Sequence, residues 1–384
     1  MVSDYTEVQQ AIRRVVREFA RKEVAPGAAE RDASGRFDYG LYRRLGELGI
    51  PGLTFPVDLD GGGADFLTFC LAVEEVARVD LSLSWALGVA PAGAQQITML
   101  ATPEQKRLWL EDWVKPVIRG EAVTAAAITE PDAGSDTAGI RTSAVLDGDE
   151  WVINGCKAFI TNAGLDNNLF VTVLCLTDRE ARRFDTIIVP KDTPGYRVMP
   201  AYRKMGLRSS DTRELAFEDC RVPAINRIGS QGGGRSRTVR GFFAARIMLA
   251  STALGLAEEC LEIASAYARE RHAFRRPIAA FQYVQGMLVE MALNLELGRL
   301  IRDKAARLLD RGMPHGKESA MAKWFCCESG KQAADHAVQV FGGMGFMDEC
   351  PASRYYRDIR AATIADGSTQ IQKHIIAREM GLLG

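Results

Sequence analysis

Apolar residues recur at three- and four-residue spacing along the first third of the chain, a pattern that predicts amphipathic helices. The expected buried face of the first helix comprises Val8, Ile12, Val15, Val16, Phe19 and Ala20. Pro26 and Gly27 are expected to end that helix. Similar periodic segments follow at 39–48, 66–79 and 104–117, separated by glycines and other breakers. The pattern predicts an all-helical first domain over residues 1–121.

The hydrophobic period shortens after about residue 124. Trp151–Ile153, Phe170–Leu176 and Ile187–Val189 are short apolar runs bounded by Gly, Asp, Asn and Pro, as is typical of β-strands. These runs predict a β-rich middle domain over residues 122–232.

Long helical patterns return after the glycine-rich break Gly229–Gly234. Val284, Met287, Leu288, Met291 and Leu295 form one apolar stripe, which is typical of a helix that packs in a bundle core. We expect a helical bundle over residues 233–384. Because helices and strands are segregated along the chain, the predicted fold class is α+β rather than a doubly wound sheet. Gly342–Gly345 lacks the full dinucleotide fingerprint, so a nicotinamide-binding Rossmann domain is not expected.

The composition is that of an ordinary soluble enzyme. At 384 residues the chain exceeds one compact core, and its formal net charge of −1 indicates neither a nucleic-acid nor a membrane partner. The first residues lack an apolar signal segment and carry several acids, so we expect a cytoplasmic protein. Eight cysteines without C-x-x-C pairing are expected to be buried free thiols, and four histidines without ligand spacing indicate no metal site.

Three motifs lie along the chain: TEPDAGSD at Thr129–Asp136, WVINGCKAFITNA at Trp151–Ala163 and IADGSTQIQ at Ile364–Gln372. Further segments of the same pattern are Lys204–Thr212, Phe217–Asp219, Tyr267–Phe274 and Gln339–Phe346. Together they resemble the acyl-CoA dehydrogenase family over nearly the whole chain. The resemblance implies an N-terminal helical domain, a middle β-barrel domain, a C-terminal four-helix bundle and FAD as the cofactor.

The resemblance places the catalytic base at Asp366, where most members of the family carry Glu. Removing hydrogen from the α and β carbons of a thioester requires a base for the α-proton and an acceptor for the β-hydride, which a carboxylate opposite a flavin provides. Gly367 permits close backbone approach. Without the family pattern, a turn or helix-cap aspartate would be the ordinary interpretation of Asp366.

Asp is one methylene shorter than Glu, so the Asp366 carboxylate reaches about 1.5 Å less. Misplacement of a catalytic group by about 1 Å can lower the reaction rate roughly a hundredfold. We therefore expect a substrate with a bulky or cyclic acyl group, which brings its α-carbon nearer to Asp366. The departure also resembles the alicyclic branch of the family, the cyclohexanecarboxyl-CoA and cyclohexene-carboxyl-CoA dehydrogenase type.

For the flavin ring, the resemblance implies Thr129, Thr161 and an aromatic contact from Phe159. For the pyrophosphate it implies Gly342, Gly343 and Arg271, which reach the cofactor of a neighbouring subunit in the family. The other cofactor positions implied by it are Ser135, Phe274, Gln339, Ser368 and Gln370. Each residue also has an ordinary alternative as a strand threonine, a core aromatic or a helix-end hydrogen-bonding group.

Beside the thioester arm the resemblance implies Ser135, Arg246, Asp366 and Gly367. Some members have an acid three residues before that arginine to bind the pantetheine arm, but Phe243 stands there. In another branch the base precedes the arginine, where this chain has Ala245, so Asp366 has no evident substitute. Glu258 and Glu259 are expected to be exposed helix charges, and Arg275 stands where the family usually has glycine.

The expected activity is FAD-dependent removal of an α-proton and a β-hydride from an acyl-CoA to give an enoyl-CoA. The resemblance implies a homotetramer, a dimer of dimers, that is reoxidised by an electron-transfer flavoprotein. Three alternatives stay open: a dehydrogenase of acyl groups bound to a carrier protein in secondary metabolism, a nitroalkane oxidase-like flavoprotein, and a flavin-free scaffold protein on this fold.

Overall fold

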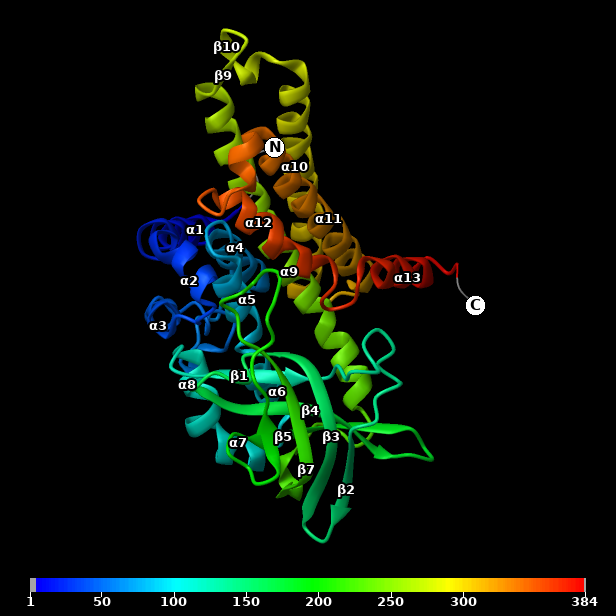
Figure 1. Cartoon of the computed structure of the whole chain (residues 1–384). Helices are drawn as coiled ribbons and strands as arrows, with labels where there is room; N and C mark the ends of the chain where they lie inside the picture. Colours follow the sequence, from blue (N-terminus) through cyan, green and yellow to red (C-terminus); the bar gives the residue numbers. More distant parts are fainter. Residues whose placement is uncertain (1–4, 383–384) are drawn as a thin grey trace.

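The structure, a computed structural model, describes residues 5–382, apart from the side chain of Val239 (Figure 1). A β-sheet forms one end of the molecule, and a hairpin of two long helices forms the opposite end. The first N-terminal helices, up to residue 89, lie along the side between these two ends, and the later ones, over 92–118, lie beside the sheet. The predicted order of helices, strands and helices is therefore confirmed, and with it the α+β class.

The N-terminal part is helical throughout. Its helices are α1 (Glu7–Phe19), α2 (Ala28–Ser34), α3 (Tyr39–Glu47), α4 (Phe66–Ala77), α5 (Leu81–Val89), α6 (Ala92–Leu100), α7 (Pro103–Trp109) and α8 (Lys115–Ile118). Thr6 and Thr102 form capping boxes, and Asp65 and Asp80 accept backbone hydrogen bonds at the starts of α4 and α5. These side chains satisfy amide groups that have no partner inside their own helix.

Three details of the predicted helices are wrong. Val8 and Val15 are 66% and 50% exposed, because the buried face of α1 is centred on Gln9, Val16 and Ala20, about 100° further round the helix. Pro26 does not end the helical path, which continues through a π-helical turn and a 3₁₀ turn into α2. Pro26 is tolerated because it stands in the first turn of a helical segment, where its missing N–H is not needed. A π-helical turn likewise divides the expected helix over 104–117 into α7 and α8.

The middle part is one eight-stranded sheet. Its strands are β1 (Val123–Ala127), β2 (Ser143–Asp147), β3 (Glu150–Thr161), β4 (Asn168–Asp178), β5 (Arg183–Pro190), β6 (Tyr196–Val198), β7 (Thr212–Pro223) and β8 (Arg227–Ile228). The strand order is β6-β7-β3-β2-β4-β5-β8, with β1 parallel to β4. Because this order has two ends among the described strands, we describe a sheet rather than a closed barrel. The three predicted strand segments lie in β3, β4 and β5.

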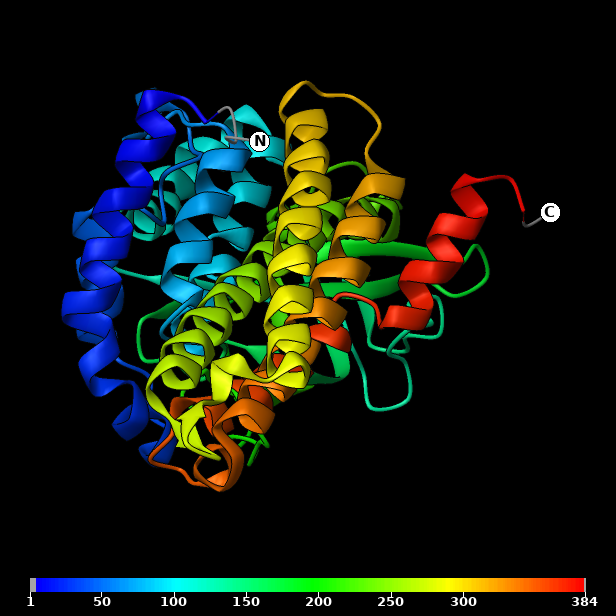
Figure 2. The same ribbon diagram turned by 90° about the horizontal axis from the view of Figure 1, so that it is seen from above.

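The C-terminal part contains α9 (Gly234–Glu270), α10 (Gln282–Asp310), α11 (Gly316–Phe341), α12 (Pro351–Ile359) and α13 (Thr369–Glu379). The short strands β9 (His272–Ala273) and β10 (Arg276–Pro277) lie between α9 and α10 at the tip of the hairpin. The long helices α9, α10 and α11 pack side by side (Figure 2), with α4 against α9 and α13 against α11. Met291 and Leu295 of the predicted α10 stripe are buried, and its other members pack against the core. The domain limits at residues 121 and 232 stay predictions.

Helix α9 is long and apolar enough, by length and composition alone, to cross a membrane. Most of its apolar window is buried inside the protein, where Leu249, Leu254 and Cys260 belong to the main core. These contacts are those of the central helix of a bundle.

Buried ion pairs join the N-terminal helices to α9 and α10. Glu74 and Arg302 are both fully buried, with Oε2 and Nη1 2.8 Å apart, and Arg299 Nη2 lies 2.6 Å from Glu74 Oε1. Glu258 and Glu259 pair with Arg78 at 3.1 and 3.0 Å and are only about one fifth exposed. The expectation that these two acids are exposed is therefore wrong, because α4 covers this face of α9.

All eight cysteines are free thiols. Seven are buried as expected, and Cys156 is partly exposed.

Candidate active site

Asp366 lies in a tight loop between the 3₁₀ turn Arg360–Thr363 and α13. Asp366 has φ 52° and Gly367 has φ 91°, so two successive residues adopt left-handed backbone conformations. Such conformations are uncommon for residues other than glycine and are maintained only where the surroundings hold them. Ser368 caps α13, because its hydroxyl accepts a hydrogen bond from the Ile371 amide at 3.5 Å.

Three side chains hold the carbonyl groups of this loop. Arg246 Nε of α9 donates to Asp366 O at 3.2 Å, and Lys323 Nζ of α11 donates to Gly367 O at 2.7 Å. Gln372 Nε2 of α13 donates to both carbonyls, at 3.2 and 2.7 Å. Lys323 and Gln372 are fully buried. The backbone of the predicted base is therefore fixed by three helices.

Sequence reasoning missed Lys323 and Gln372. Gln372 ends the IADGSTQIQ motif, and its place there is the one signal that would have found it. Lys323 is an ordinary lysine within a helical pattern, 44 positions from the carbonyl that it binds. Nothing local distinguishes it from a surface lysine.

The surroundings change the acidity of this group of residues. Burial raises the pKa of the Asp366 carboxyl, and the Lys323 and Arg246 cations partly oppose that rise. Burial also lowers the pKa of Lys323, and it lowers the pKa of Arg246 to about 10. Among the described residues, no side chain donates a hydrogen bond to the Asp366 carboxylate. A carboxylate with a raised pKa and free oxygens is suited to accept a proton near neutral pH.

Arg246 is a buried cation beside Asp366, the predicted base. It is 4% exposed, and its Nη1 has no hydrogen-bond partner in the described part of the chain. The guanidinium carbon lies 5.3 Å from the Phe243 ring centroid and 5.8 Å from that of Phe242. The Phe243 ring in turn contacts His315 edge to face at 5.8 Å. Phe243 thus gives this wall an apolar, aromatic character where an acid would have offered a hydrogen bond.

Three predicted flavin residues come together at one end of β3. The Ala158 amide donates to Thr129 O at 2.9 Å, which places Thr129 next to Phe159, and Thr161 pairs with Thr212 of β7. Phe159 has φ 60°, lies at an irregularity of the β3–β7 pairing and is 64% exposed. An exposed aromatic ring on a bulge offers a flat apolar surface, which fits the isoalloxazine ring of a flavin.

A second group of predicted cofactor residues lies at the opposite end of the C-terminal helices (Figure 1). The Tyr267 and Phe341 rings stack at 4.4 Å and bring the ends of α9 and α11 together. Arg271, Phe274, Gln339, Gly342 and Gly343 follow or adjoin these rings, and all are exposed. The two glycines have no atom within 4 Å of the position of a Cβ. This open glycine turn beside an arginine fits a pyrophosphate group.

The structure does not bring the two groups together within one chain. The hairpin end, with Arg271, lies far from the sheet that carries Phe159 (Figure 1). The residues at the sheet fit the ring end of FAD, and those at the hairpin end fit a pyrophosphate, at opposite ends of one chain. FAD supplies a hydride acceptor when bound.

The remaining predicted residues lie around the Asp366 loop. Ser135 is exposed on the loop between β1 and β2, which Figures 1 and 2 show beside the start of α13. Gln370 is exposed in the first turn of α13. The Ser368 hydroxyl is engaged as a helix cap, so its contact with a cofactor stays a prediction.

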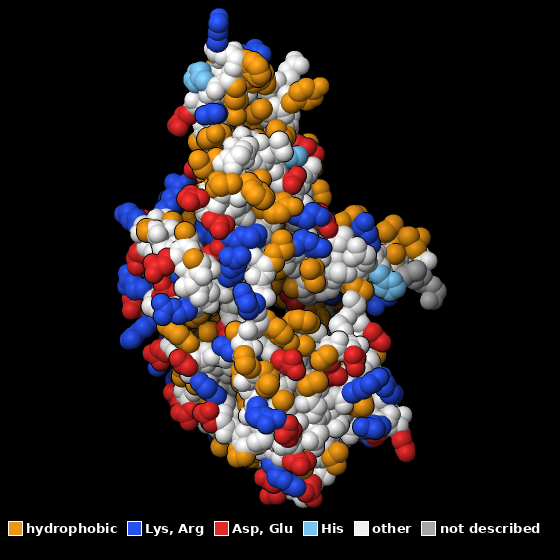
Figure 3. Space-filling view, viewed as in Figure 1, with side chains coloured by type: hydrophobic (Ala, Val, Ile, Leu, Met, Phe, Trp, Pro, Cys, Tyr) orange, Lys and Arg blue, Asp and Glu red, His pale blue; other side chains and the backbone are white. Residues whose placement is uncertain are grey.

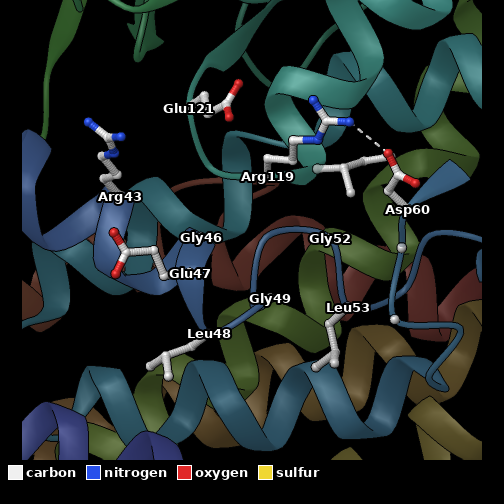
Figure 4. Close-up of a pocket in the computed structure, with 13 residues that line it drawn as sticks. Arg43, Gly46, Glu47, Leu48, Gly49, Gly52, Leu53, Asp60, Arg119 and Glu121 are labelled. Carbon is white, nitrogen blue, oxygen red and sulfur yellow. Dashed lines mark hydrogen bonds and ion pairs between the residues drawn. The ribbon is translucent and has the colours of Figure 1, made fainter.

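A separate hollow lies between α3 and α8 (Figure 4). Its lining includes Arg43, Gly52 and Glu121, together with Arg119 and Asp60, which form an ion pair at 2.8 Å. None of the predicted site residues lines this hollow. We therefore assign the candidate site to the Asp366 loop and not to the hollow.

Three family models match the chain in succession: the N-terminal domain of acyl-CoA dehydrogenase over residues 6–116, the middle domain over 125–220 and the C-terminal domain over 232–381. A relative in Bacillus subtilis (strain 168), described as probable acyl-CoA dehydrogenase YngJ, is 39% identical over 380 residues, which cover 98% of this chain and 99% of the relative. The structure of butyryl-CoA dehydrogenase from Megasphaera elsdenii matches with a TM-score of 0.94 and 32% identity, covering 99% and 100% of the two chains. The prolyl acyl carrier protein oxidase AnaB matches with a TM-score of 0.93 and 28% identity, covering 98% and 100%.

Proposed function

Because this chain belongs to the acyl-CoA dehydrogenase family, whose members are FAD-dependent oxidoreductases, we propose that it dehydrogenates an alicyclic or branched acyl-CoA between Cα and Cβ. In this proposal the Asp366 carboxylate takes the α-proton. Arg246, Lys323 and Gln372 keep the Asp366 backbone in place while the proton moves. The product is an enoyl thioester, and a ring acid of the cyclohexanecarboxyl-CoA type is the substrate class of this proposal.

The observation that carries the substrate preference is the fixed backbone of the short base. A shorter carboxylate can be compensated by a backbone shift or by a substrate that comes closer. Four hydrogen bonds to two adjacent carbonyls oppose the backbone shift. A branched or cyclic α-carbon, which is broader than a methylene, would meet the carboxylate across the remaining distance of about 1.5 Å.

Anaerobic reduction of the bound flavin tests this proposal directly. Cyclohexanecarboxyl-CoA, cyclohexene-carboxyl-CoA, isobutyryl-CoA, butyryl-CoA and octanoyl-CoA are mixed with the purified protein, and the loss of flavin absorbance is followed for each. We expect a cyclic or branched thioester to react fastest. Faster reaction of butyryl-CoA or octanoyl-CoA would contradict the preference and leave the family assignment intact.

A second candidate is a dehydrogenase of acyl groups held on a carrier protein. The aromatic wall of Phe243 and Arg246 fits either donor, because CoA and a holo carrier protein carry the same pantetheine arm. The similarity to a solved prolyl acyl carrier protein oxidase supports the carrier-bound substrate. The test compares the rate of flavin reduction by the same acyl group on CoA and on a holo carrier protein. The faster donor identifies which of the two candidate functions is correct.

We further propose a homotetramer, a dimer of dimers, with an electron-transfer flavoprotein as the acceptor and the cytoplasm as its location. Exposed apolar side chains support the assembly: Phe274 at the hairpin tip is 90% exposed, and Val289, Leu293, Leu297 and Leu300 form an exposed stripe on α10. Patches of this kind commonly mark protein interfaces. The separation of the two groups of cofactor residues also supports a shared site.

A further inference from the structure

Exposed arginines gather on three segments near the β1–β2 loop. Arg141 ends that loop, Arg182 lies in the turn between β4 and β5, and Arg235 and Arg240 lie in the first turns of α9. We call these four residues the arginine surface. Figure 3 shows Lys and Arg side chains gathered over the β4–β5 turn and the start of α9. The three segments, 131–141, 178–183 and 234–240, contain seven arginines and four acids in a chain of net charge −1.

Side-chain contacts hold the arginine surface together. Arg235 Nε donates to Thr137 Oγ1 at 3.5 Å, and the Arg182 guanidinium donates to Ala138 O and packs over the Phe184 ring. Both arginines therefore reach the loop that Arg141 ends. The three guanidinium groups converge on the β1–β2 loop that also carries Ser135.

The positive charge of the arginine surface is largely uncompensated. Within the described residues, Arg182, Arg235 and Arg240 form no ion pair, and the Arg141 side chain, 83% exposed, lies 4.0 Å from an equally exposed Asp132. By contrast, Arg221 on β7 pairs with two acids, at 2.9 and 3.2 Å. The first turn of α9 contains no acid either, so its arginines add to the positive end of the helix dipole. An anionic partner would relieve this repulsion.

One face of α9 connects the arginine surface to the Asp366 loop. Arg235 and Arg246 are eleven residues apart, which places them on the same face of the helix and about 16 Å apart along it. Phe242 lies between them on that face. Exposure decreases along it, from exposed Arg235 through partly buried Phe242 to buried Arg246. An extended phosphopantetheine arm, with about thirteen bonds from phosphorus to sulfur, spans roughly 15 Å.

We propose that the arginine surface docks an acidic carrier protein, whose phosphopantetheine arm lies along this face of α9 and presents the acyl group to Asp366. The proposal rests on the second candidate function above, dehydrogenation of an acyl group held on a carrier protein, and names the surface that binds this partner. Arg235 and Arg240 are roughly 140° apart around the helix and ~7.5 Å apart along it. A partner that contacts Arg240 as well as the three arginines at the β1–β2 loop must extend over two sides of α9, as the acidic face of a folded protein does.

Charge reversal on α9 tests the docking. Isobutyryl and cyclohexanecarbonyl groups are loaded on a holo acyl carrier protein and on free pantetheine, and flavin reduction is followed for wild type and for the double variant R235E/R240E. We expect KM for the carrier-bound substrate to rise at least about tenfold in the variant, and KM for the pantetheine thioester to change less than about twofold. The matched control R36E/R43E makes the same charge change on exposed residues of the N-terminal domain and should alter neither.

The salt dependence of wild type gives a second measurement that needs no variant. Between about 50 and 200 mM NaCl, KM should rise for the carrier-bound substrate and stay constant for the pantetheine thioester, because salt screens exposed charges. The proposal would be overturned if R235E/R240E left the KM for the carrier-bound substrate unchanged. It would also be overturned if the variant raised the KM for the matching acyl-CoA by the same factor, because the surface would then bind the phosphates of CoA. Failure of every thioester, pantetheine included, would instead refute the proposed function.

Discussion

Asp358 Oδ1 accepts a hydrogen bond from the Leu207 amide at 2.6 Å and so ties α12 to the loop before β7. Leu207 has φ 50°, and Gly206 leaves no room for a Cβ beside Arg357 O. The same loop leads through Thr212 to the β3 end that carries Thr161. Asp358 therefore connects the helix before the Asp366 loop with the predicted flavin region.

The Asp358–Leu207 contact predicts a pH-dependent stability. Burial raises the pKa of Asp358 to about 7. Because this folded-state pKa exceeds the unfolded value, the contribution of Asp358 to stability is complete below about pH 4 and is lost as pH rises through 7. The melting temperature of wild type relative to D358N should therefore fall between pH 5 and 8. A constant difference between the two proteins across this range would contradict the assignment. D358A, which also removes the acceptor, should be less stable than D358N at every pH.

The length of the base can be tested at position 366. D366N should retain FAD and lose a factor of about 10²–10⁴ in the rate of flavin reduction, the usual contribution of a general base. D366E restores the missing methylene, so the ratio of kcat/KM for butyryl-CoA to that for cyclohexanecarboxyl-CoA should rise by roughly tenfold or more. An unchanged ratio in D366E would mean that the substrate preference does not depend on the length of the side chain at position 366. Undiminished reduction in D366N would remove Asp366 from the reaction.

Lys323 should influence both the position and the acidity of the base. K323M removes the donor to Gly367 O and a cation that lowers the pKa of Asp366. We expect the pKa of Asp366 to rise, so the acidic limb of the pH profile of kcat/KM should move to higher pH. K304M makes the same chemical change at an exposed position of α10 and serves as the control. A loss of rate without movement of the limb would mean that Lys323 acts on loop geometry alone.

The Glu74–Arg302 pair should dominate the stability of the helical core. Burial tends to raise the pKa of Glu74, but Arg299, Arg302 and Arg13 outweigh it and hold the pKa below its usual value. Glu74 therefore contributes stability above about pH 4 that is lost as pH falls through the folded-state pKa. E74Q removes the buried carboxylate shared by Arg299 and Arg302 and leaves Arg302 with Asp303 alone among the described acids, so it should cost about 3–5 kcal/mol, visible as a lower melting temperature at pH 7. The double variant E74L/R302M should be more stable than E74Q, which excludes a simple packing effect.

The exposed stripe on α10 predicts the effect of charge on assembly. L293D/L297D places two carboxylates on the stripe and should produce species smaller than a tetramer in light scattering, with loss of FAD if the cofactor site is shared. The variant V145D makes a similar change at an exposed position of β2 and should leave the assembly intact. A tetramer in L293D/L297D would place the interface elsewhere.

Local patterns in the sequence determined much of this protein. The spacing of apolar residues and the positions of glycine and proline located the helical, β and helical parts in order. The apolar stripe on α10 identified the buried face of that helix. These signals depend only on residues within one or two turns of each other. The resemblance of the IADGSTQIQ motif to the family pattern singled out Asp366, and the same resemblance implied Arg246 and drew attention to Phe243 three residues before it. The same local reasoning failed where packing decided the outcome: Val8 and Val15 of α1 are exposed, and Glu258 and Glu259 are covered by α4.

Only the tertiary structure decided which residues hold the predicted base and how the predicted cofactor residues are divided. Lys323 and Gln372 bind the Asp366 loop from different helices, and the Asp358–Leu207 contact joins positions 151 residues apart. Packing between distant segments also separates Phe159 from Arg271. The same kind of packing brings Arg182 and Arg235 to the loop that Arg141 ends. Such contacts have no local period, because their energies depend on burial and distance after folding and not on sequence neighbours.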